Sequence, residues 1–265
     1  PSCFKSTPNS TLTLNHWLAE IPEPELIQRP RLLLLRGRIL NWDLGEPKLA
    51  MVFFERAQAQ FRQQDDLTGA AEAQMWQAVS LRIMGRAQES ISLATKALDQ
   101  LTSLKADDQI IALAIRNRGI AHWTTGNITA ALRDIRQALE LFERLGDKYS
   151  VGMCHHEIGV FLVAQGNISG ADQHYRQALH IWETLGNANA LANTLNSLGV
   201  SLQMIGRYDE ARQQFNESLE IALQIGATRR AAFAQAGIGD TYLELQEYER
   251  AIEAYTKSTD FAQEA

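Results

Sequence analysis

The densest group of chemically versatile side chains in the sequence is His155-His156-Glu157. Imidazole nitrogens and carboxylate oxygens are ligands for Zn²⁺, so these three residues raise the hypothesis of a metal centre. Zinc-binding histidines on one helix are usually four residues apart, whereas adjacent residues diverge by about 100° around the helix axis. The triplet therefore predicts no metal site. We expect His155 to pack against neighbouring helices and His156 to face a binding surface.

No motif for catalysis accompanies this triplet. The sequence contains no GxxxxGK[ST] phosphate loop, no HExxH motif and no CxxC pair. Gly237-Ile238-Gly239 and Gly199-Val200-Ser201 lie in apolar patterns typical of helices, without the strand–turn–helix context of a dinucleotide turn or a nucleophile elbow. We therefore predict that the chain is not an enzyme and binds no cofactor.

A repeat of about 40 residues organises the chain and determines which surfaces can carry function. Its clearest copy is the segment 191–226, and weaker copies begin near residue 32. The glycine at 199 recurs at steps of 40 residues as Gly119, Gly159 and Gly239. A fixed period between about 20 and 50 residues is the signature of a solenoid built from stacked units.

Each copy predicts two amphipathic helices joined by a tight turn. In the fifth copy the apolar residues step by three and four, first over 191–202 and then over 208–219. Gly199 lies within this apolar stripe and indicates a close contact between helices. Gly206 suits the left-handed end of the first helix. At the corresponding turns, Asn127 and Asn167 are suited to cap the next helix.

The predicted organisation is an irregular lead-in with a short helix over 1–30, followed by an all-α solenoid over 31–265. Its repeats lie near 31–66, 67–107, 108–148, 149–188, 189–228 and 229–265. The expected helices are 31–43 and 47–63, 67–84 and 87–104, 109–125 and 128–145, 149–165 and 168–185, 189–205 and 208–225, and 229–245 and 248 to the end. All six prolines lie in the first 47 residues, which leaves the later helices uninterrupted.

The amino-acid composition of the chain argues against nucleic acids and membranes as partners. The 265 residues carry a net charge of −6 without a basic run, so we expect no direct binding of nucleic acid. No apolar stretch approaches the roughly 18 residues that span a bilayer, so we expect no membrane insertion. The two cysteines, Cys3 and Cys154, predict no structural disulfide, and Cys154 is expected to be a buried thiol in a cytoplasmic protein. Because the chain starts at Pro1 and stops just before the next turn would recur, we expect it to be part of a larger protein.

The small residues at 199, 206, 211 and 218, with an aromatic residue at 215, resemble the tetratricopeptide repeat. Tyr175 and Tyr255 match that aromatic position, whereas Ile135 and Ala94 depart from it. The period of 40 exceeds the usual 34 and is similar to the long repeats of kinesin light chains and of LGN-related polarity adaptors. The resemblance implies a right-handed superhelical solenoid of about six antiparallel helix pairs, with the first helix of each pair lining a concave groove.

The resemblance also implies that this groove binds a protein or a peptide. Asn196 lies in Leu195-Asn196-Ser197-Leu198, which resembles the family's LNNL motif, whose asparagines hold the backbone of an extended peptide. In phase with Gly199, the fourth repeat also places Met153 and the second repeat places Met75 and Val79 along the groove. Contact with a partner and simple solvation of a helix surface both remain open for every such residue. The candidate partner-binding residues are Arg116, Asn117, Trp123, His156, Glu157, Asn193, Asn196 and Gln203.

A second resemblance lies near the N-terminus. The pattern Trp17-Leu18, Ile21-Pro22, Leu26 and Arg29-Pro30, followed by the leucines at 32–35, is similar to the start of the repeat domain in maltose-activator-type signal-transduction ATPases. It implies an alternative function, an effector-sensing domain of a transcription regulator that responds to a small molecule or a protein. Self-association through the repeat ends is a further expectation, based on an apolar face of Tyr248, Ala251 and Tyr255.

Overall fold

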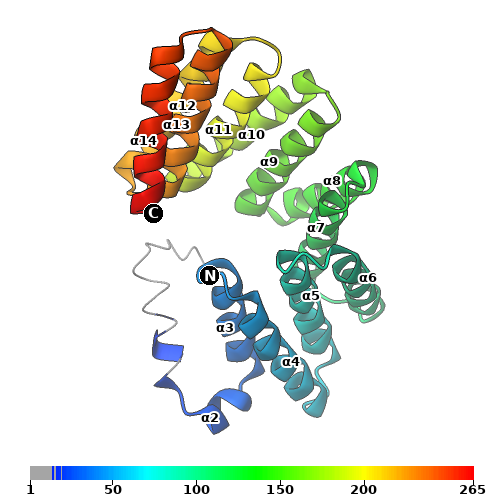
Figure 1. Cartoon of the computed structure of the whole chain (residues 1–265). Helices are drawn as coiled ribbons and strands as arrows, with labels where there is room; N and C mark the ends of the chain where they lie inside the picture. Colours follow the sequence, from blue (N-terminus) through cyan, green and yellow to red (C-terminus); the bar gives the residue numbers. More distant parts are fainter. Residues whose placement is uncertain (1–13, 15, 19) are drawn as a thin grey trace. The chain divides into compact units, whose positions relative to one another are not determined.

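The computed structural model describes residues 14, 16–18 and 20–265, and these residues form helices and turns without any strand (Figure 1). Cys3 and most of the expected lead-in lie outside the described residues. The helices are α2 (Glu23–Ile27), α3 (Pro30–Trp42), α4 (Pro47–Gln63), α5 (Leu67–Ile83), α6 (Ala87–Ser103), α7 (Asp108–Thr124), α8 (Ile128–Leu145), α9 (Lys148–Ala164), α10 (Ile168–Leu185), α11 (Ala188–Gln203), α12 (Tyr208–Gln224), α13 (Thr228–Glu244) and α14 (Tyr248–Glu264).

Helices α3 to α14 begin and end within two residues of the bounds expected from the repeat. Local chemistry explains this agreement. The side chains of Asn127 and Asn167 accept hydrogen bonds from the backbone N–H groups three residues later, at 3.1 and 3.0 Å, so both cap their helices as predicted. Helix α2 lies within the expected lead-in and begins at Glu23. Pro24 lies in its first turn, where a missing N–H breaks no helical hydrogen bond.

The turn within a repeat depends on a left-handed residue. Gly206 has a φ of 75°, and the N–H of Arg207 then donates to the carbonyl of Leu202 at 3.0 Å. The same conformation is adopted by Gln246 in the last repeat, with a φ of 61°. A residue with a Cβ is disfavoured in this conformation, so the last turn carries local strain that the glycine turns avoid.

The glycines of the 40-residue series are sites of close helix contact, as predicted. A Cβ on Gly199 would lie 2.7 Å from a carbon of the Phe215 ring, and one on Gly159 would lie 2.5 Å from the Tyr175 ring. The Phe215 ring also lies against Gly237 of the next repeat. One aromatic side chain therefore fills the space between two first helices and the second helix that carries it.

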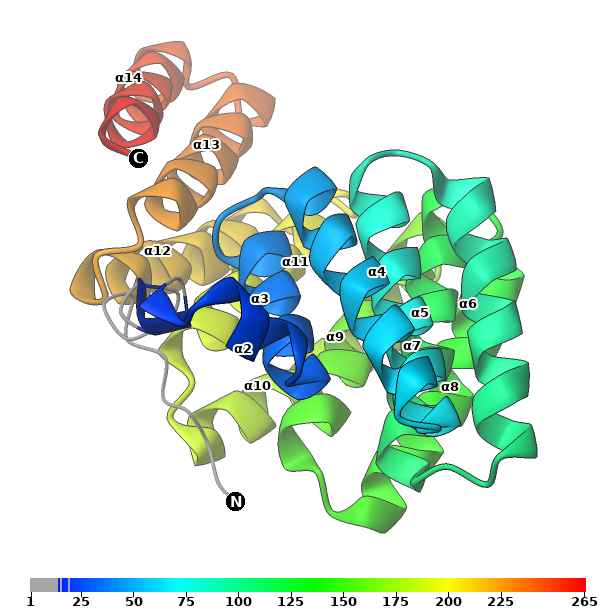
Figure 2. The same ribbon diagram turned by 90° about the horizontal axis from the view of Figure 1, so that it is seen from below.

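The chain divides into two compact units, residues 1–141 and 142–265, and each is described by itself. In the first unit, α3, α5 and α7 are first helices, α5 contacts both of the others, and α4 and α6 pack beside them. In the second unit, the pairs α9/α10, α11/α12 and α13/α14 pack in succession, and α11 also contacts α9 and α13 (Figure 2). No helix in the described part of the chain is both long and apolar enough to cross a membrane.

Candidate functional site

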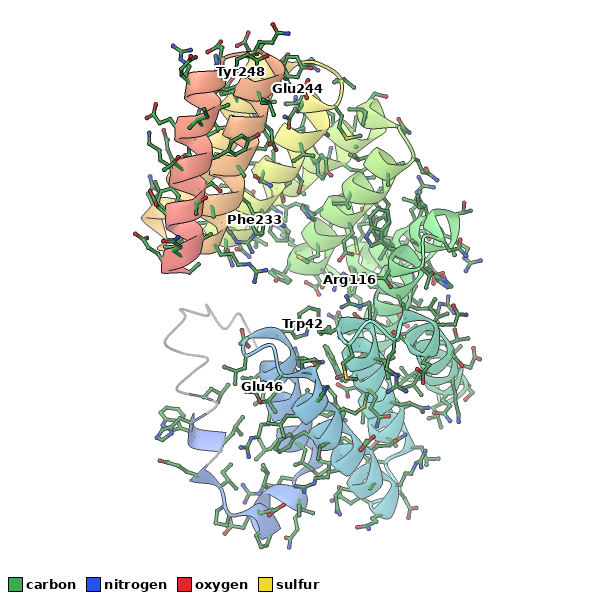
Figure 3. All side chains as sticks on the ribbon, in the orientation of Figure 1. Trp42, Glu46, Arg116, Phe233, Glu244 and Tyr248 are labelled. Carbon is green, nitrogen blue, oxygen red and sulfur yellow. The ribbon has the colours of Figure 1, made fainter. Side chains whose placement is uncertain are left out.

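The first helices of the second unit form the surface on which most of the predicted contacts lie. Helix α11 lies between α9 and α13 and contacts both. We call the side chains that these helices present in phase with Gly199 the first-helix face. Figure 3 labels one of its members, Phe233. The face comprises His156, Val160, Asn193, Asn196, Val200, Gln203, Phe233 and Leu243.

A chain of hydrogen bonds joins three repeats across this face. The Thr194 hydroxyl donates to the carbonyl of Ala190, so it is an acceptor for the Nδ1–H of His156 at 3.0 Å. The Nε2 of His156 is then an acceptor for the amide of Asn193 at 3.3 Å. This assignment follows from the network and makes His156 the neutral Nδ1–H tautomer. The structure thus brings together two predicted residues, His156 and Asn193.

The chain of hydrogen bonds ends on Arg230, which is not among the predicted contact residues. Its Nη1 donates to the Asn193 side-chain oxygen at 2.8 Å, and its Nε donates to the side-chain oxygen of Asn189. Both polar ends of the Asn193 amide are therefore used inside the chain. Asn193 holds its neighbours in place, and its side-chain amide keeps one further N–H and one further lone pair for a ligand.

Exposed apolar side chains lie among these polar groups. Phe233 is 57% exposed, Leu243 47% and Val200 42%. Gln203 is half-buried on the same stripe of α11 as Asn196. The side-chain oxygen of Asn196 is enclosed and accepts no hydrogen bond. Since most enclosed polar atoms in folded proteins are hydrogen-bonded, folding alone does not explain an asparagine at this position.

The adjacent histidines point to different helices, as expected from their spacing. The Nδ1 of His155 lies 2.9 Å from the Nδ1 of His174 on α10, whereas His156 reaches Thr194 on α11. Burial lowers the pKa of His155. Among the described residues, no three His, Cys, Asp or Glu side chains are arranged to hold a metal ion. Cys154 is buried, as predicted, and Glu157 is half-buried on α9.

Three candidate residues lie on α7 of the first unit. Arg116 and Trp123 are half-buried, whereas Asn117 is 6% exposed and offers little surface to a partner. The expectation that Met75 and Val79 line a groove was wrong, because both are buried. Helix α5 contacts α3, α4, α6 and α7, and these neighbours cover almost all of its surface.

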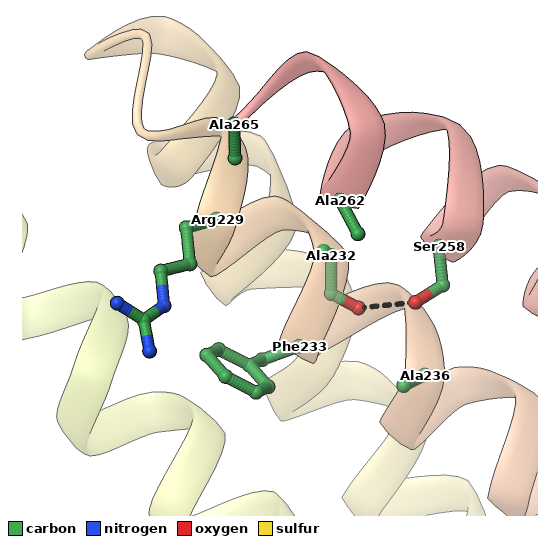
Figure 4. A pocket seen from close by; sticks show the side chains of 7 residues that line it. All are labelled: Arg229, Ala232, Phe233, Ala236, Ser258, Ala262 and Ala265. Carbon is green, nitrogen blue, oxygen red and sulfur yellow. Dashed lines mark hydrogen bonds between the residues drawn. The ribbon is translucent and has the colours of Figure 1, made fainter.

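An open cavity of about 500 Å³ lies between α13 and α14 (Figure 4). Ser258 of α14 lines the cavity, and its hydroxyl donates a hydrogen bond to the carbonyl of Ala232 on α13 at 2.8 Å. Ser218 makes the matching bond to Ala192 one repeat earlier, where Ala192 is fully buried. Helix α13 covers that earlier position. The cavity is lined by Arg229, Ala232, Phe233, Ala236, Ser258, Ala262 and Ala265.

The expectation that Tyr248, Ala251 and Tyr255 form an exposed apolar face on the last repeat was wrong for two of these residues. Ala251 is buried, and the Tyr255 ring lies against Gly239 and donates its hydroxyl to Asp240 at 2.6 Å. Both side chains therefore pack within the α13/α14 pair. The error arose because a second helix turns its small and aromatic residues toward its own first helix, and only Tyr248 of the expected face is well exposed.

A family model described as tetratricopeptide repeat matches residues 69–144, 153–224 and 190–264. The chain belongs to the tetratricopeptide repeat family. In this family the helical pairs serve mostly as scaffolds for interactions with other proteins. No curated protein sequence matches the chain.

Solved structures share this fold at low sequence identity. A Rap protein complexed with competence and sporulation factor superposes with a TM-score of 0.75 and 15% identity, over 97% of this chain and 81% of that one. The signal-transduction ATPase with a tetratricopeptide repeat sensor from Pyrococcus horikoshii gives a TM-score of 0.72 and 17% identity, over 92% of this chain and 39% of that one. Repeats of kinesin light chain type from Podosopora anserina give 0.59 and 15%, over 75% and 97%. These similarities concern the fold.

Proposed function

We propose that this chain is an interaction scaffold whose first-helix face binds a peptide segment of a partner protein. The observation that carries the proposal is the exposure of Val200, Phe233 and Leu243 on helices whose polar side chains are held by hydrogen bonds. Exposed apolar groups rimmed by polar ones are typical of interaction sites on soluble proteins. Burying these side chains against a partner would stabilise the complex by removing them from water.

The polar groups of this face have two different roles in the proposal. His156 and Asn193 are locked to each other and to the neighbouring repeats, so they keep α9, α11 and α13 in register. A rigid face loses little conformational entropy on binding. Asn196 and Gln203 lie on the same stripe. The Gln203 amide offers a donor and an acceptor to the backbone of a peptide, whereas the enclosed oxygen of Asn196 leaves only its amide nitrogen, as a donor.

Co-purification with the full-length protein from its source, followed by mass spectrometry, identifies the partner and allows the face to be tested. We expect the combined Val200→Ser and Phe233→Ser change to release the partner. The matched control is Ile252→Ser, which removes an apolar side chain of 66% exposure from α14. Equal retention by both variants would contradict the proposal.

The runner-up function is an effector-sensing domain of a larger signal-transduction ATPase that regulates transcription. It is supported by the N-terminal pattern from Trp17 to Leu35 and by the similar fold of the Pyrococcus horikoshii protein. The genomic sequence around this segment distinguishes the two functions. A nucleotide-binding domain encoded upstream in the same gene would support the effector-sensing function. A gene without such a domain would contradict it.

Two further properties belong to the proposal. A cytoplasmic location fits Cys154, which is in no disulfide, since a reducing compartment disfavours disulfide formation. Self-association would use the open surface between α13 and α14, and light scattering at increasing protein concentration measures it. Replacement of Ala262 by Glu in this surface should then restore the monomer.

A further inference from the structure

The turns inside the fifth and sixth repeats expose four large apolar side chains. Met204 is 60% exposed, Ile205 48%, Leu245 38% and Tyr248 55%. Met204 and Ile205 follow α11, Leu245 follows α13, and Tyr248 is the first residue of α14 at this end of the helix pair (Figure 3). We call these four residues the turn edge. None of them belongs to a first helix, so the turn edge is distinct from the first-helix face.

The two turns lie side by side in the second unit. The Tyr208 hydroxyl, at the start of α12, donates to a carboxylate oxygen of Glu244 at 3.5 Å. The guanidinium groups of Arg212 on α12 and Arg250 on α14 both lie over the Tyr242 ring, each 5.6 Å from its centroid. These contacts join the fifth repeat to the sixth next to their turns. The exposed apolar side chains of the two turns therefore belong to one surface.

The fold does not require apolar side chains in these turns. The third and fourth repeats have Thr124-Thr125 and Ala164-Gln165 where the fifth has Met204-Ile205. In all three repeats the next residue is a glycine with a φ between 75° and 78°, and the N–H that follows it donates to the carbonyl five residues earlier. The same turn thus forms with polar or small residues. Neighbouring exposed apolar groups that folding does not need are typical of an interaction site.

The turn of the sixth repeat departs from this pattern in a second way. Gln246 has a φ of 61°, in a position that glycine occupies in the third, fourth and fifth repeats. A residue with a Cβ is strained in this conformation, and such strain clusters at binding sites. Gln246 is exposed and follows Leu245 directly, so it keeps a side chain within the turn edge that glycine would lack.

The turn edge is surrounded by negative charge. Residues 204–212 and 244–252 contain five carboxylates and three arginines. Each arginine pairs with a carboxylate of its own repeat, and the pairs are Arg207 with Glu210, Arg212 with Asp209 and Arg250 with Glu247. The other two carboxylates, Glu244 and Glu249, are exposed and form no ion pair within the described part of the chain. Their charges are therefore available to a positively charged partner.

We propose that the turn edge binds a segment of a partner protein that carries lysine or arginine beside apolar side chains. The apolar side chains of this segment are buried against Ile205, Leu245 and Tyr248, which removes all of them from water. Its positive charges lie near Glu244 and Glu249, and this match of charge gives the interaction its specificity. The inference goes beyond the proposed function, because it does not require the first-helix face to bind a peptide.

Charge favours this partner over two other occupants of an apolar surface. A second copy of the chain would bring two turn edges together, each with an excess of two carboxylates, and like charges oppose such a contact. Anionic lipid headgroups are repelled for the same reason. A basic segment with apolar side chains uses both the apolar groups and the unpaired carboxylates.

Selection of random peptides displayed on phage tests the inference. The library is first depleted on the variant Ile205→Ser with Leu245→Ser, called the edge variant, and is then selected on the unchanged chain. We expect the recovered peptides to combine apolar residues with lysine or arginine. Their affinity for the edge variant should be about tenfold lower or more, because two apolar contacts are lost. The matched control is Leu185→Ser with Leu223→Ser, which alters exposed side chains at the opposite ends of α10 and α12 and should leave the affinity unchanged.

A second pair of variants tests the charge. Glu244→Gln with Glu249→Gln should weaken binding of the recovered peptides about threefold or more and reduce its dependence on salt. Glu217→Gln with Glu220→Gln is the matched control, because both carboxylates are exposed further along α12. Replacing lysine or arginine by glutamine in the peptides should weaken binding to the unchanged chain by a similar factor. Thermal melting of every variant checks that the chain still folds.

Several results would overturn the inference. A selection that yields no peptide sensitive to the edge variant does so, as do edge-sensitive peptides without lysine or arginine, or with unchanged affinity for Glu244→Gln with Glu249→Gln. A dimer that sedimentation velocity detects, and that dissociates in the edge variant, identifies a second copy as the occupant and also overturns it. Val200→Ser with Phe233→Ser should leave the affinity of the peptides unchanged. An equal loss in that variant assigns them to the first-helix face, which overturns the inference and leaves the proposed function intact.

Discussion

Replacement of Asp134 by asparagine should destabilise the first unit more than any exposed charge change. The Asp134 side chain is fully buried, and its two oxygens accept hydrogen bonds from Arg118 Nε at 2.6 Å and Nη2 at 3.0 Å. Arg133 adds a third contact at 3.2 Å, and His122 Nε2 lies 3.9 Å away. The amide removes the charge and leaves the Arg118 guanidinium enclosed without a counterion. Breaking a buried pair in this way costs about 3–5 kcal/mol.

Urea unfolding followed by circular dichroism measures this cost. With a slope of about 3 kcal/mol per molar, a loss of about 4 kcal/mol lowers the midpoint by more than about 1 M. The matched control is Asp172→Asn, which breaks an exposed pair with Arg176 on α10 and should cost about 0.5 kcal/mol or less. A similar small shift in both variants would refute the argument that burial makes the difference.

A double variant refines the same test. Arg118→Met with Asp134→Leu removes both charges and fills the space with apolar groups. Because desolvation of a buried pair offsets much of its attraction, this variant should be clearly more stable than Asp134→Asn alone. A double variant that is no more stable than Asp134→Asn would show that the hydrogen-bond geometry, and not the uncompensated charge, carries the cost.

Three further predictions concern the turns, the packing and the pH response. Gln246→Gly should stabilise the last repeat by about 0.5–1 kcal/mol, measured by thermal melting, because it relieves a left-handed residue. Gly199→Ala should destabilise by about 1–3 kcal/mol, because its Cβ would meet the Phe215 ring at 2.7 Å; an unchanged midpoint would show that the ring can move. Burial lowers the pKa of His155 below 6.5, so the unfolded chain binds more protons and stability should fall as pH drops below about 6.5 toward the folded pKa. His155→Gln should flatten that part of the melting-temperature profile, and an unchanged slope would count against His155 as its source.

The fold could be predicted from the sequence because the signals within each helix agree with the 40-residue repeat of the whole chain. Apolar stripes, the Asn127 and Asn167 caps and the left-handed Gly206 each point to the same helix ends. Such consistency between levels is expected of a sequence that specifies one fold. How deeply a side chain on a first helix is buried was harder to predict. Met75 lies on the expected stripe, yet the four neighbours of α5 bury it, and a repeat pattern does not encode how many neighbours each copy has.

The candidate site was only partly predictable, because its members come from different repeats. The His156 and Asn193 positions followed from their phase, but their bond and the Arg230 partner did not. Contacts between neighbouring repeats recur at separations close to one period, with 37 residues from Asn193 to His156 and 37 from Arg230 to Asn193. The pair Ser80 and Asn41 in the first unit is 39 residues apart.

These separations give a rule for interpreting such chains from sequence. A polar residue on a first helix should be examined together with the residues about 37 to 41 positions away on either side, since the stacked first helices place them in contact. Applied to Asn193, the rule selects Arg230 on one side and His156 on the other. Applied to Arg230, it selects Asn189 and Asn193, the two residues that its guanidinium contacts. The polar contacts between neighbouring first helices are thus visible in the sequence once the register of the repeats is known.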